Sequence, residues 1–144
     1  KKIKKVNLLI GRNFSLTGIV VKGAGRGKLL GFPTANIYIQ NPLLQIPPNG
    51  VYFVKVFYKN IQYYGVCNVG NRPTFDTQET KIIEVYLFLI KPQNFYGKEL
   101  KVEFIQFIRD EKKFESKEKL IDQIKKDKMI CQKIMDDQGM KKRR

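Results

Sequence analysis

A succession of short β-type segments is the feature that most constrains how this chain can fold. Between residues 16 and 108, runs of β-branched, aromatic and other apolar residues are separated by glycine, proline and asparagine. The predicted strands are Leu16–Lys22, Ala35–Gln40, Val51–Tyr58, Ile61–Val69, Lys81–Ile90 and Lys98–Ile108. Lys59 and Asn60 predict a hairpin turn between the third and fourth strands, and Gly70–Thr80 is expected to be a polar loop.

A helix is predicted after the last of these strands. It should begin near Ser116, a good N-cap, with Glu118 in its first turn, and Gly139 is a plausible end. Its apolar residues fall on one stripe, which we interpret as a packing surface: Leu120, Ile121, Ile124, Cys131, Ile134 and Met135. Six strands and one late helix favour a mainly β fold. We expect a closed or nearly closed antiparallel barrel with the helix on one side or end.

The length of 144 residues fits one domain with a proper core. We expect a short helix or linker end within residues 1–14, the globular domain over 15–138 and a basic tail over 139–144. No apolar run approaches the ~18 residues of a membrane helix, and Val6–Ile10 is too short for a signal-peptide core. A cytoplasmic protein is therefore predicted.

The composition excludes several kinds of chemistry. The chain has no histidine, so histidine general bases, serine–histidine triads and histidine-bound zinc are excluded. Cys67 and Cys131 are the two cysteines and are expected to be reduced, buried thiols. The net charge of +15 is compatible with a nucleic acid, a polyanionic small substrate or a lysine-rich background. Much of this charge lies at residues 1–5 and 141–144, where solvated tails are common.

The segment 23–36 is dense in glycine and in groups that can bind phosphate. Backbone N–H groups of a glycine-rich loop can approach an anion closely, cationic side chains add charge, and hydroxyl and amide oxygens suit Mg²⁺. No Gly-Lys-Ser/Thr follows the glycines, so the segment is not a Walker A loop. The candidate phosphate-binding residues are Gly23, Gly25, Arg26, Gly27, Lys28, Thr34 and Asn36, with Thr34 and Asn36 as candidate metal ligands. The alternative is an ordinary turn between strands with an asparagine hydrogen bond.

Glu84 is the strongest candidate for a catalytic residue. Its neighbours from Ile82 to Ile90 are all apolar or aromatic, and such breaks in a local pattern tend to mark functional sites. By strand alternation Glu84 shares a face with Ile82, Tyr86 and Phe88. A carboxylate in such surroundings is suited to act as a general base. The alternative is a glutamate paired with lysine or arginine at a barrel rim.

Several segments together resemble the riboflavin kinase family, in the family's order. The most specific is Gly-Ala-Gly-Arg-Gly-Lys-Leu-Leu-Gly-Phe-Pro-Thr-Ala-Asn at 23–36. Further matches are Gly50–Tyr52, Asn68–Phe75, Ile83–Val85, Phe95–Gly97 and Arg109–Phe114. The resemblance runs from about residue 8 to about residue 126. The chain is similar to both stand-alone kinases and the C-terminal kinase module of bacterial bifunctional FAD synthetases.

The resemblance implies a six-stranded Greek-key barrel with a C-terminal helix and transfer of a phosphoryl group from ATP to the riboflavin 5′-hydroxyl. It makes Glu84 the base, places Mg²⁺ at Thr34 and Asn36, and wraps the glycine segment around the phosphates. It also implies a possible fused FMN adenylyltransferase domain in a longer protein. Nucleic acid and membranes are not expected as partners.

The resemblance assigns roles to further residues outside the glycine-rich segment. The loop that contains Arg109 and Phe114 would fold over the flavin, although a simple strand-to-helix linker is the alternative. Asn68 and Arg72 would support the site, or Arg72 would be an ordinary surface residue. Tyr96 would contact the nucleotide or only pack.

The chain departs from the family at a few positions. Tyr86 stands where relatives often carry histidine, Leu89 lies where an acidic residue is common, and Ala24 replaces a polar residue. The first two differences could change how adenine or the ribityl chain is held. Two non-catalytic readings stay open: a basic barrel that binds single-stranded nucleic acid, and a barrel that binds flavin without turnover.

Overall fold

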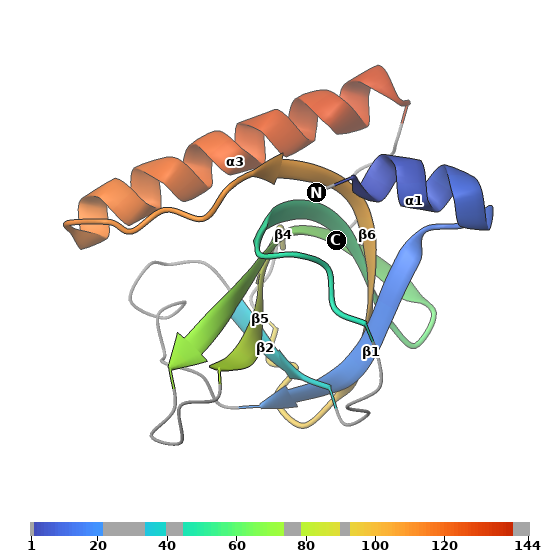
Figure 1. Ribbon diagram of the computed structural model, residues 1–144, viewed down its shortest axis with the longest axis horizontal. Coiled ribbons are helices and arrows are strands. Elements are labelled where there is room, and N and C mark those ends of the chain that lie inside the picture. The colour runs from blue at the N-terminus through green and yellow to red at the C-terminus, as the bar shows by residue number, and fades with distance from the viewer. Residues whose placement is uncertain (1, 22–33, 40–44, 74–78, 90–92, 140–144) are drawn as a thin grey trace.

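The fold is a closed six-stranded β-barrel with one helix at each end of the chain (Figure 1). The computed structural model describes residues 2–21, 34–39, 45–73, 79–89 and 93–139, with the backbone alone at 72, 73, 79 and 80. The strands are β1 (Phe14–Val21), β2 (Thr34–Tyr38), β3 (Gly50–Tyr58), β4 (Ile61–Pro73), β5 (Glu79–Leu87) and β6 (Glu99–Arg109). The helices are α1 (Ile3–Ile10) and α3 (Lys117–Asp137). All neighbouring strands are antiparallel, in the order β1-β2-β5-β4-β3-β6, which confirms the predicted fold class.

Alternation along the strands divides the apolar residues between two layers. On β3, Tyr52 and Val54 point into the barrel core, whereas Val51 and Phe53 belong to a second cluster outside it. Inside, the Tyr52 and Phe104 rings meet edge to face, with centroids 5.2 Å apart. The interior is therefore filled by side chains, so the barrel's functional groups must lie on its outside or at its ends.

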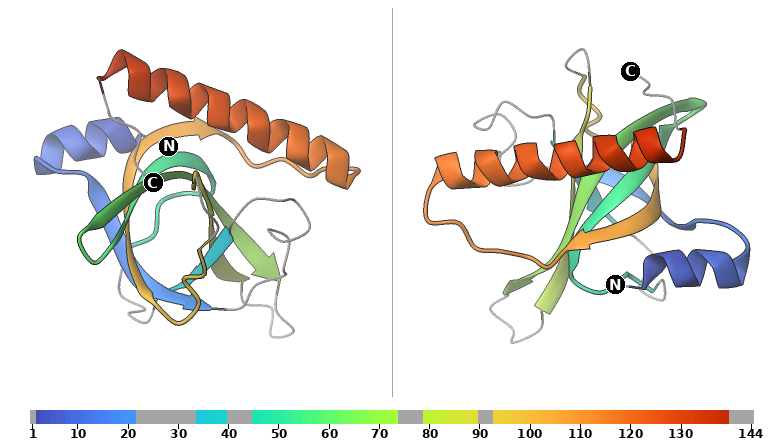
Figure 2. Two further views of the ribbon diagram at one scale, coloured as in Figure 1. Left: turned by 180° about the vertical axis from the view of Figure 1, so that it is seen from behind. Right: turned by 90° about the horizontal axis from the view of Figure 1, so that it is seen from above.

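Helix α3 covers part of the outer face of the barrel, as Figures 1 and 2 show. Its buried residues Cys131 and Met135 pack in the outer cluster that contains Phe53 and Val66. Ser116 is the N-cap, and its hydroxyl accepts a hydrogen bond from the backbone N–H of Lys119 at 3.2 Å. The predicted helix, its start and its packing stripe are confirmed.

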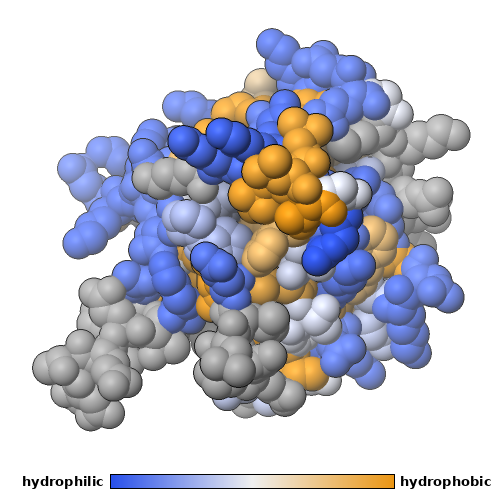
Figure 3. All heavy atoms as spheres, turned by 45° about the vertical axis from the view of Figure 1, so that its right-hand side comes forward, coloured by the Kyte–Doolittle hydropathy of each residue, from blue (hydrophilic) through white to orange (hydrophobic). Residues whose placement is uncertain are grey.

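Helix α1 is fixed to the barrel by one asparagine. The Asn7 side chain donates to the carbonyl of Phe104 at 2.8 Å and accepts from the backbone N–H of Phe14 at 2.7 Å. Leu8 and Leu9 point outward and are 83% and 77% exposed. Figure 3 turns this side forward and shows an apolar patch among hydrophilic surroundings. The helix lies away from the β6–α3 connection in Figures 1 and 2, so it does not contribute to the pocket described below.

The predicted polar loop at Gly70–Thr80 is wrong at both ends. Strand β4 continues to Pro73 and β5 already begins at Glu79, with Asn71 opposite Lys81 in the ladder. Polar residues are compatible with a strand whose outer face meets water, and composition alone does not reveal this. The predicted end of β3 at Tyr58 and start of β4 at Ile61 are confirmed, and the remaining strand limits differ from the predictions by one to three residues.

Neither described helix is long and apolar enough to cross a membrane. Both cysteines are free and buried, as predicted. Burial, with a smaller contribution from the charge of Glu84, raises the pKa of the Cys67 thiol. Burial, with a smaller contribution from Asp127, likewise raises the pKa of the Cys131 thiol. Burial also raises the pKa of Tyr52 to about 12, and Cys67 adds to this shift.

These shifts predict that the protein loses stability at alkaline pH. The unfolded thiols and phenol release their protons near their ordinary pKa values of 9.0 and 10.0, before the folded groups do. Their contribution is complete below about pH 9 and is lost as the pH rises further. Urea unfolding at pH 8, 9, 10 and 11 should show a falling free energy of unfolding. A constant value from pH 8 to 11 would contradict this account.

Candidate active site

The candidate site is built around Glu84 on the outer face of β5. Asn36 on β2 and Asn68 on β4 are its direct partners in the two neighbouring ladders. Residues opposite one another in antiparallel strands share a face, with Cβ atoms about 5 Å apart. Three polar side chains from three strands therefore form one row, Asn36–Glu84–Asn68.

A second row lies two residues further along β5, on the same face. It contains Thr34, Tyr86 and Val66, because Tyr86 pairs with Thr34 on one side and with Val66 on the other. The Tyr86 hydroxyl donates a hydrogen bond of 2.9 Å to Oε1 of Glu84. The two rows therefore place the candidate base opposite Asn36 and diagonal to Thr34, the two candidate metal ligands.

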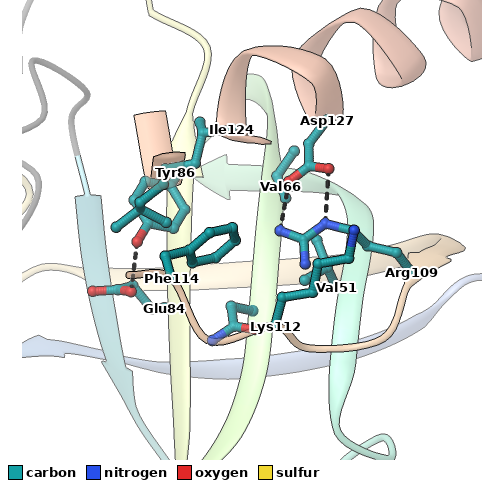
Figure 4. A pocket seen from close by; sticks show the side chains of 11 residues that line it. Val51, Val66, Glu84, Tyr86, Arg109, Lys112, Phe114, Ile124 and Asp127 are labelled. Atoms are coloured by element: carbon teal, nitrogen blue, oxygen red, sulfur yellow. Dashed lines mark hydrogen bonds and ion pairs between the residues drawn. The ribbon is translucent and has the colours of Figure 1, made fainter. Parts of the chain in front are cut away.

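A pocket opens over the β4 and β5 residues of these rows, beneath α3 and the loop 110–116 that precedes it (Figure 4). Thr34 and Asn36 of β2 do not line it. Its volume is about 70 Å³. It is lined by polar and apolar residues from β3, β4, β5, β6, the loop and α3: Val51, Val66, Asn68, Glu84, Tyr86, Arg109, Lys112, Phe114, Leu120, Ile124 and Asp127. Glu84, Asn68, Arg109 and Phe114, which were identified separately in the sequence, thus share one pocket.

A buried ion pair forms the side of the pocket away from Glu84 (Figure 4). The Arg109 guanidinium at the end of β6 makes two hydrogen bonds to the Asp127 carboxylate of α3, at 2.9 and 2.8 Å. Asp127 is 1% exposed and also accepts a hydrogen bond from Gln123 at 3.0 Å. This paired geometry fixes the plane of the guanidinium.

Phe114 lies between the two polar groups of the pocket in Figure 4. Its ring centroid is 6.0 Å from Cζ of Arg109, a cation–π distance. The loop that carries it approaches β4 closely at Gly70, where an added Cβ would overlap the carboxylate of Glu111. A side chain at position 70 would therefore displace the side chain of Glu111.

Glu84 lies in a buried environment. Glu84 is 7% exposed, and no lysine or arginine in the described part of the chain forms an ion pair with it. Within the described ranges, no group of three or more acidic or cysteine side chains could hold a metal ion.

Not every predicted site residue can be placed. Gly23, Gly25, Arg26, Gly27 and Lys28 lie outside the described residues, and so does the side chain of Arg72. Tyr96 is 54% exposed in the connection between β5 and β6 and does not line the pocket. Its prediction as a nucleotide contact therefore has no support from the pocket itself.

Sequence reasoning missed Asp127 and Lys112 and assigned no role to the hydroxyl of Tyr86. Asp127 follows Ile124 by three residues and precedes Cys131 by four, so it lies on the buried face of α3. A carboxylate within an apolar stripe is the same signal that identified Glu84. On a helix this rich in charged residues, the signal was overlooked.

Comparisons with known proteins agree with this arrangement. A family model described as riboflavin kinase matches residues 10–135. The bifunctional riboflavin kinase/FMN adenylyltransferase of Bacillus subtilis is 42% identical over 128 residues, which cover 88% of this chain and 40% of that protein. The chain thus spans about two fifths of the length of this curated relative.

Two solved structures share the fold. A Streptococcus pneumoniae structure described as a macrolide-efflux protein matches with a TM-score of 0.83 and 35% identity, covering 90% of this chain and 42% of that one. Riboflavin kinase from Trypanosoma brucei matches with a TM-score of 0.62 and 27% identity, covering 85% and 79%. On the extent of the family match and on these similarities, the chain belongs to the riboflavin kinase family.

Proposed function

We propose that this chain is a riboflavin kinase, which transfers the γ-phosphoryl group of ATP to the 5′-hydroxyl of riboflavin and yields FMN and ADP. The observation that carries the proposal is the position of its buried charges. Glu84 and Asp127 are the two buried charged side chains among the described residues, and both line one pocket. Burying a carboxylate is costly, so two in one place indicate a site kept for chemistry or binding.

Glu84 is the general base in this proposal. Phosphoryl transfer needs alignment of the attacking oxygen and neutralisation of charge more than covalent catalysis by the protein. Glu84 would orient the ribityl hydroxyl and accept its proton. Because Glu84 is buried, water would not compete with this hydroxyl for the phosphoryl group. The flanking Asn36 and Asn68 offer amide groups to the same substrate.

Thr34 and Asn36 fit the role of magnesium ligands. They lie two residues apart on β2, so both face Glu84 and Tyr86 on the same side of the sheet. Mg²⁺ prefers oxygen donors and is usually held by few protein ligands together with substrate phosphates, which suits a hydroxyl, an amide oxygen and one nearby carboxylate. The ion would supply charge neutralisation between phosphate oxygens.

Arg109 and Phe114 are assigned to the riboflavin side of the pocket. Their guanidinium and aromatic planes are suited to a planar ring system. The volume of about 70 Å³ is nevertheless far below the roughly 300 Å³ or more of ordinary ligand pockets. Binding of a three-ring flavin therefore requires Phe114 and its loop to move outward.

The proposal covers the kinase reaction alone. The name of the Bacillus subtilis relative pairs riboflavin kinase with FMN adenylyltransferase, and this chain spans about two fifths of that protein. The family match at residues 10–135 concerns the kinase. Adenylylation of FMN would need a further domain in a longer polypeptide.

A nucleic-acid role receives less support from the strand aromatics. Base stacking needs exposed rings along a basic groove. Here the Phe53 and Tyr64 rings stack on each other at 5.7 Å, and Tyr63 packs on Phe95 at 5.5 Å. We therefore expect only weak binding to a single-stranded oligonucleotide, lost as salt is raised. Tight binding that persists at 0.2 M salt would favour the alternative.

The first test is formation of FMN from riboflavin with ATP and Mg²⁺, followed by HPLC. We expect Glu84→Gln to lower kcat by at least about 100-fold, because loss of a general base typically costs 10²–10⁴-fold. Glu103→Gln is the matched control, since Glu103 is a partly buried β6 carboxylate outside the pocket. It should keep normal turnover.

Each outcome of this test has a distinct meaning. Full turnover by Glu84→Gln would remove the assigned base. Riboflavin binding by a folded parent protein without FMN formation would instead indicate a flavin-binding barrel.

A second prediction concerns the ion pair. Asp127→Asn should weaken riboflavin binding roughly tenfold, a change of about 1.4 kcal/mol, because Arg109 loses the partner that fixes it. Breaking a buried pair should also lower the free energy of unfolding by about 3 kcal/mol. Quenching of riboflavin fluorescence and urea unfolding measure the two effects.

Asp122→Asn is the control for this variant, because Asp122 is an exposed residue of the same helix. It should change neither quantity. Wild-type riboflavin affinity in folded Asp127→Asn would show that the ion pair does not shape the site.

A further inference from the structure

Tyr86 makes a direct contact with the proposed base. Its hydroxyl donates to Oε1 of Glu84 at 2.9 Å, and both side chains are buried. The two residues are separated by one position on β5, so the strand itself keeps them on the same face. Both partners of this contact therefore belong to the same strand, and no loop residue is needed to form it.

The ring of Tyr86 is held from several sides. Thr34 and Val66 are its partners on the neighbouring strands. From above, Ile124 of α3 packs against it in a small apolar cluster that also contains Leu120 and Ile121. Figure 4 shows Ile124 beside Tyr86 and the hydroxyl directed at Glu84. A ring packed in this way presents its hydroxyl in one direction.

We propose that Tyr86 is a positioning residue that orients the carboxylate of Glu84 for phosphoryl transfer. The inference rests on the proposed kinase function. The phenol holds Oε1 and thereby fixes the carboxylate plane, which leaves Oε2 to accept the proton of the substrate hydroxyl.

The proton and bond balance of the step leaves Tyr86 unchanged. The substrate oxygen gives its proton to Oε2 of Glu84 as its bond to the γ-phosphorus forms, and the bond between that phosphorus and ADP breaks. Tyr86 keeps its own proton throughout, and its hydroxyl contacts the base through Oε1. The proposed effect of Tyr86 is on the geometry of the base, so it should appear in kcat and not in KM.

Tyr86→Phe is the direct test, because it removes the hydroxyl and keeps the ring that packs against α3. We expect kcat for FMN formation to fall about tenfold, with the KM values for riboflavin and ATP within about twofold of the parent. Tyr64→Phe is the matched control. Tyr64 is also buried and its hydroxyl accepts from Gln62 at 2.9 Å, but it does not line the pocket.

The rates are expressed per riboflavin-binding site, so that a loss of folded protein does not imitate a loss of catalysis. Combining Tyr86→Phe with Glu84→Gln supplies the decisive comparison, because a residue that acts through Glu84 should have little further effect once that carboxylate is gone. A rise of KM with unchanged kcat would make Tyr86 a binding residue and overturn the inference.

Unchanged or increased turnover in Tyr86→Phe would also overturn it, the latter by showing that the phenol competes with substrate for Glu84. A parent protein that makes no FMN would contradict the proposed function itself, which distinguishes the two failures.

Discussion

The antiparallel pairing of β2, β5 and β4 is the constraint on which the site depends. It fixes Asn36 and Asn68 on either side of Glu84, and Thr34 and Val66 on either side of Tyr86. A slip of one residue in either ladder would turn one of these partners to the opposite face of the sheet. Barrel closure stabilises this register. Val85, between Glu84 and Tyr86 on β5, points into the barrel, whose interior is already filled by side chains, so a shifted register would not pack there.

The two buried carboxylates are stabilised in different ways, and this difference matches the roles proposed for them. Asp127 forms an ion pair with Arg109, which donates two hydrogen bonds to its carboxylate, and it accepts a third hydrogen bond from Gln123. Glu84 receives a hydrogen bond from the neutral hydroxyl of Tyr86 and has no ion pair with the described lysines and arginines. A carboxylate neutralised by arginine is a poor base, whereas one held by a phenol can still accept a proton.

The sequence predicted local features well and long-range pairing poorly. Glu84 was identifiable because one charge interrupts an apolar strand, and Ser116 because a cap has a local signature. The row Asn36–Glu84–Asn68 could not be derived from these signals, since β2 and β5 are distant in the chain and no hairpin sets their register. Asp127 was missed because aspartate on a lysine-rich helix usually faces water. The pairing of Asn71 with Lys81 was missed because polar residues favour loops.

Helix α3 connects the two sides of the pocket through residues one turn apart. Ile124 packs on Tyr86, which holds Glu84, and Asp127 binds Arg109, whose guanidinium faces the ring of Phe114. Residues at this spacing lie on the same face of a helix. A shift or rotation of α3 would therefore move Ile124 and Asp127 together. The same helix is anchored further along by Cys131 and Met135 in the outer apolar cluster. The packing of α3 therefore affects the position of Glu84 and of Arg109, on opposite sides of the pocket, at once.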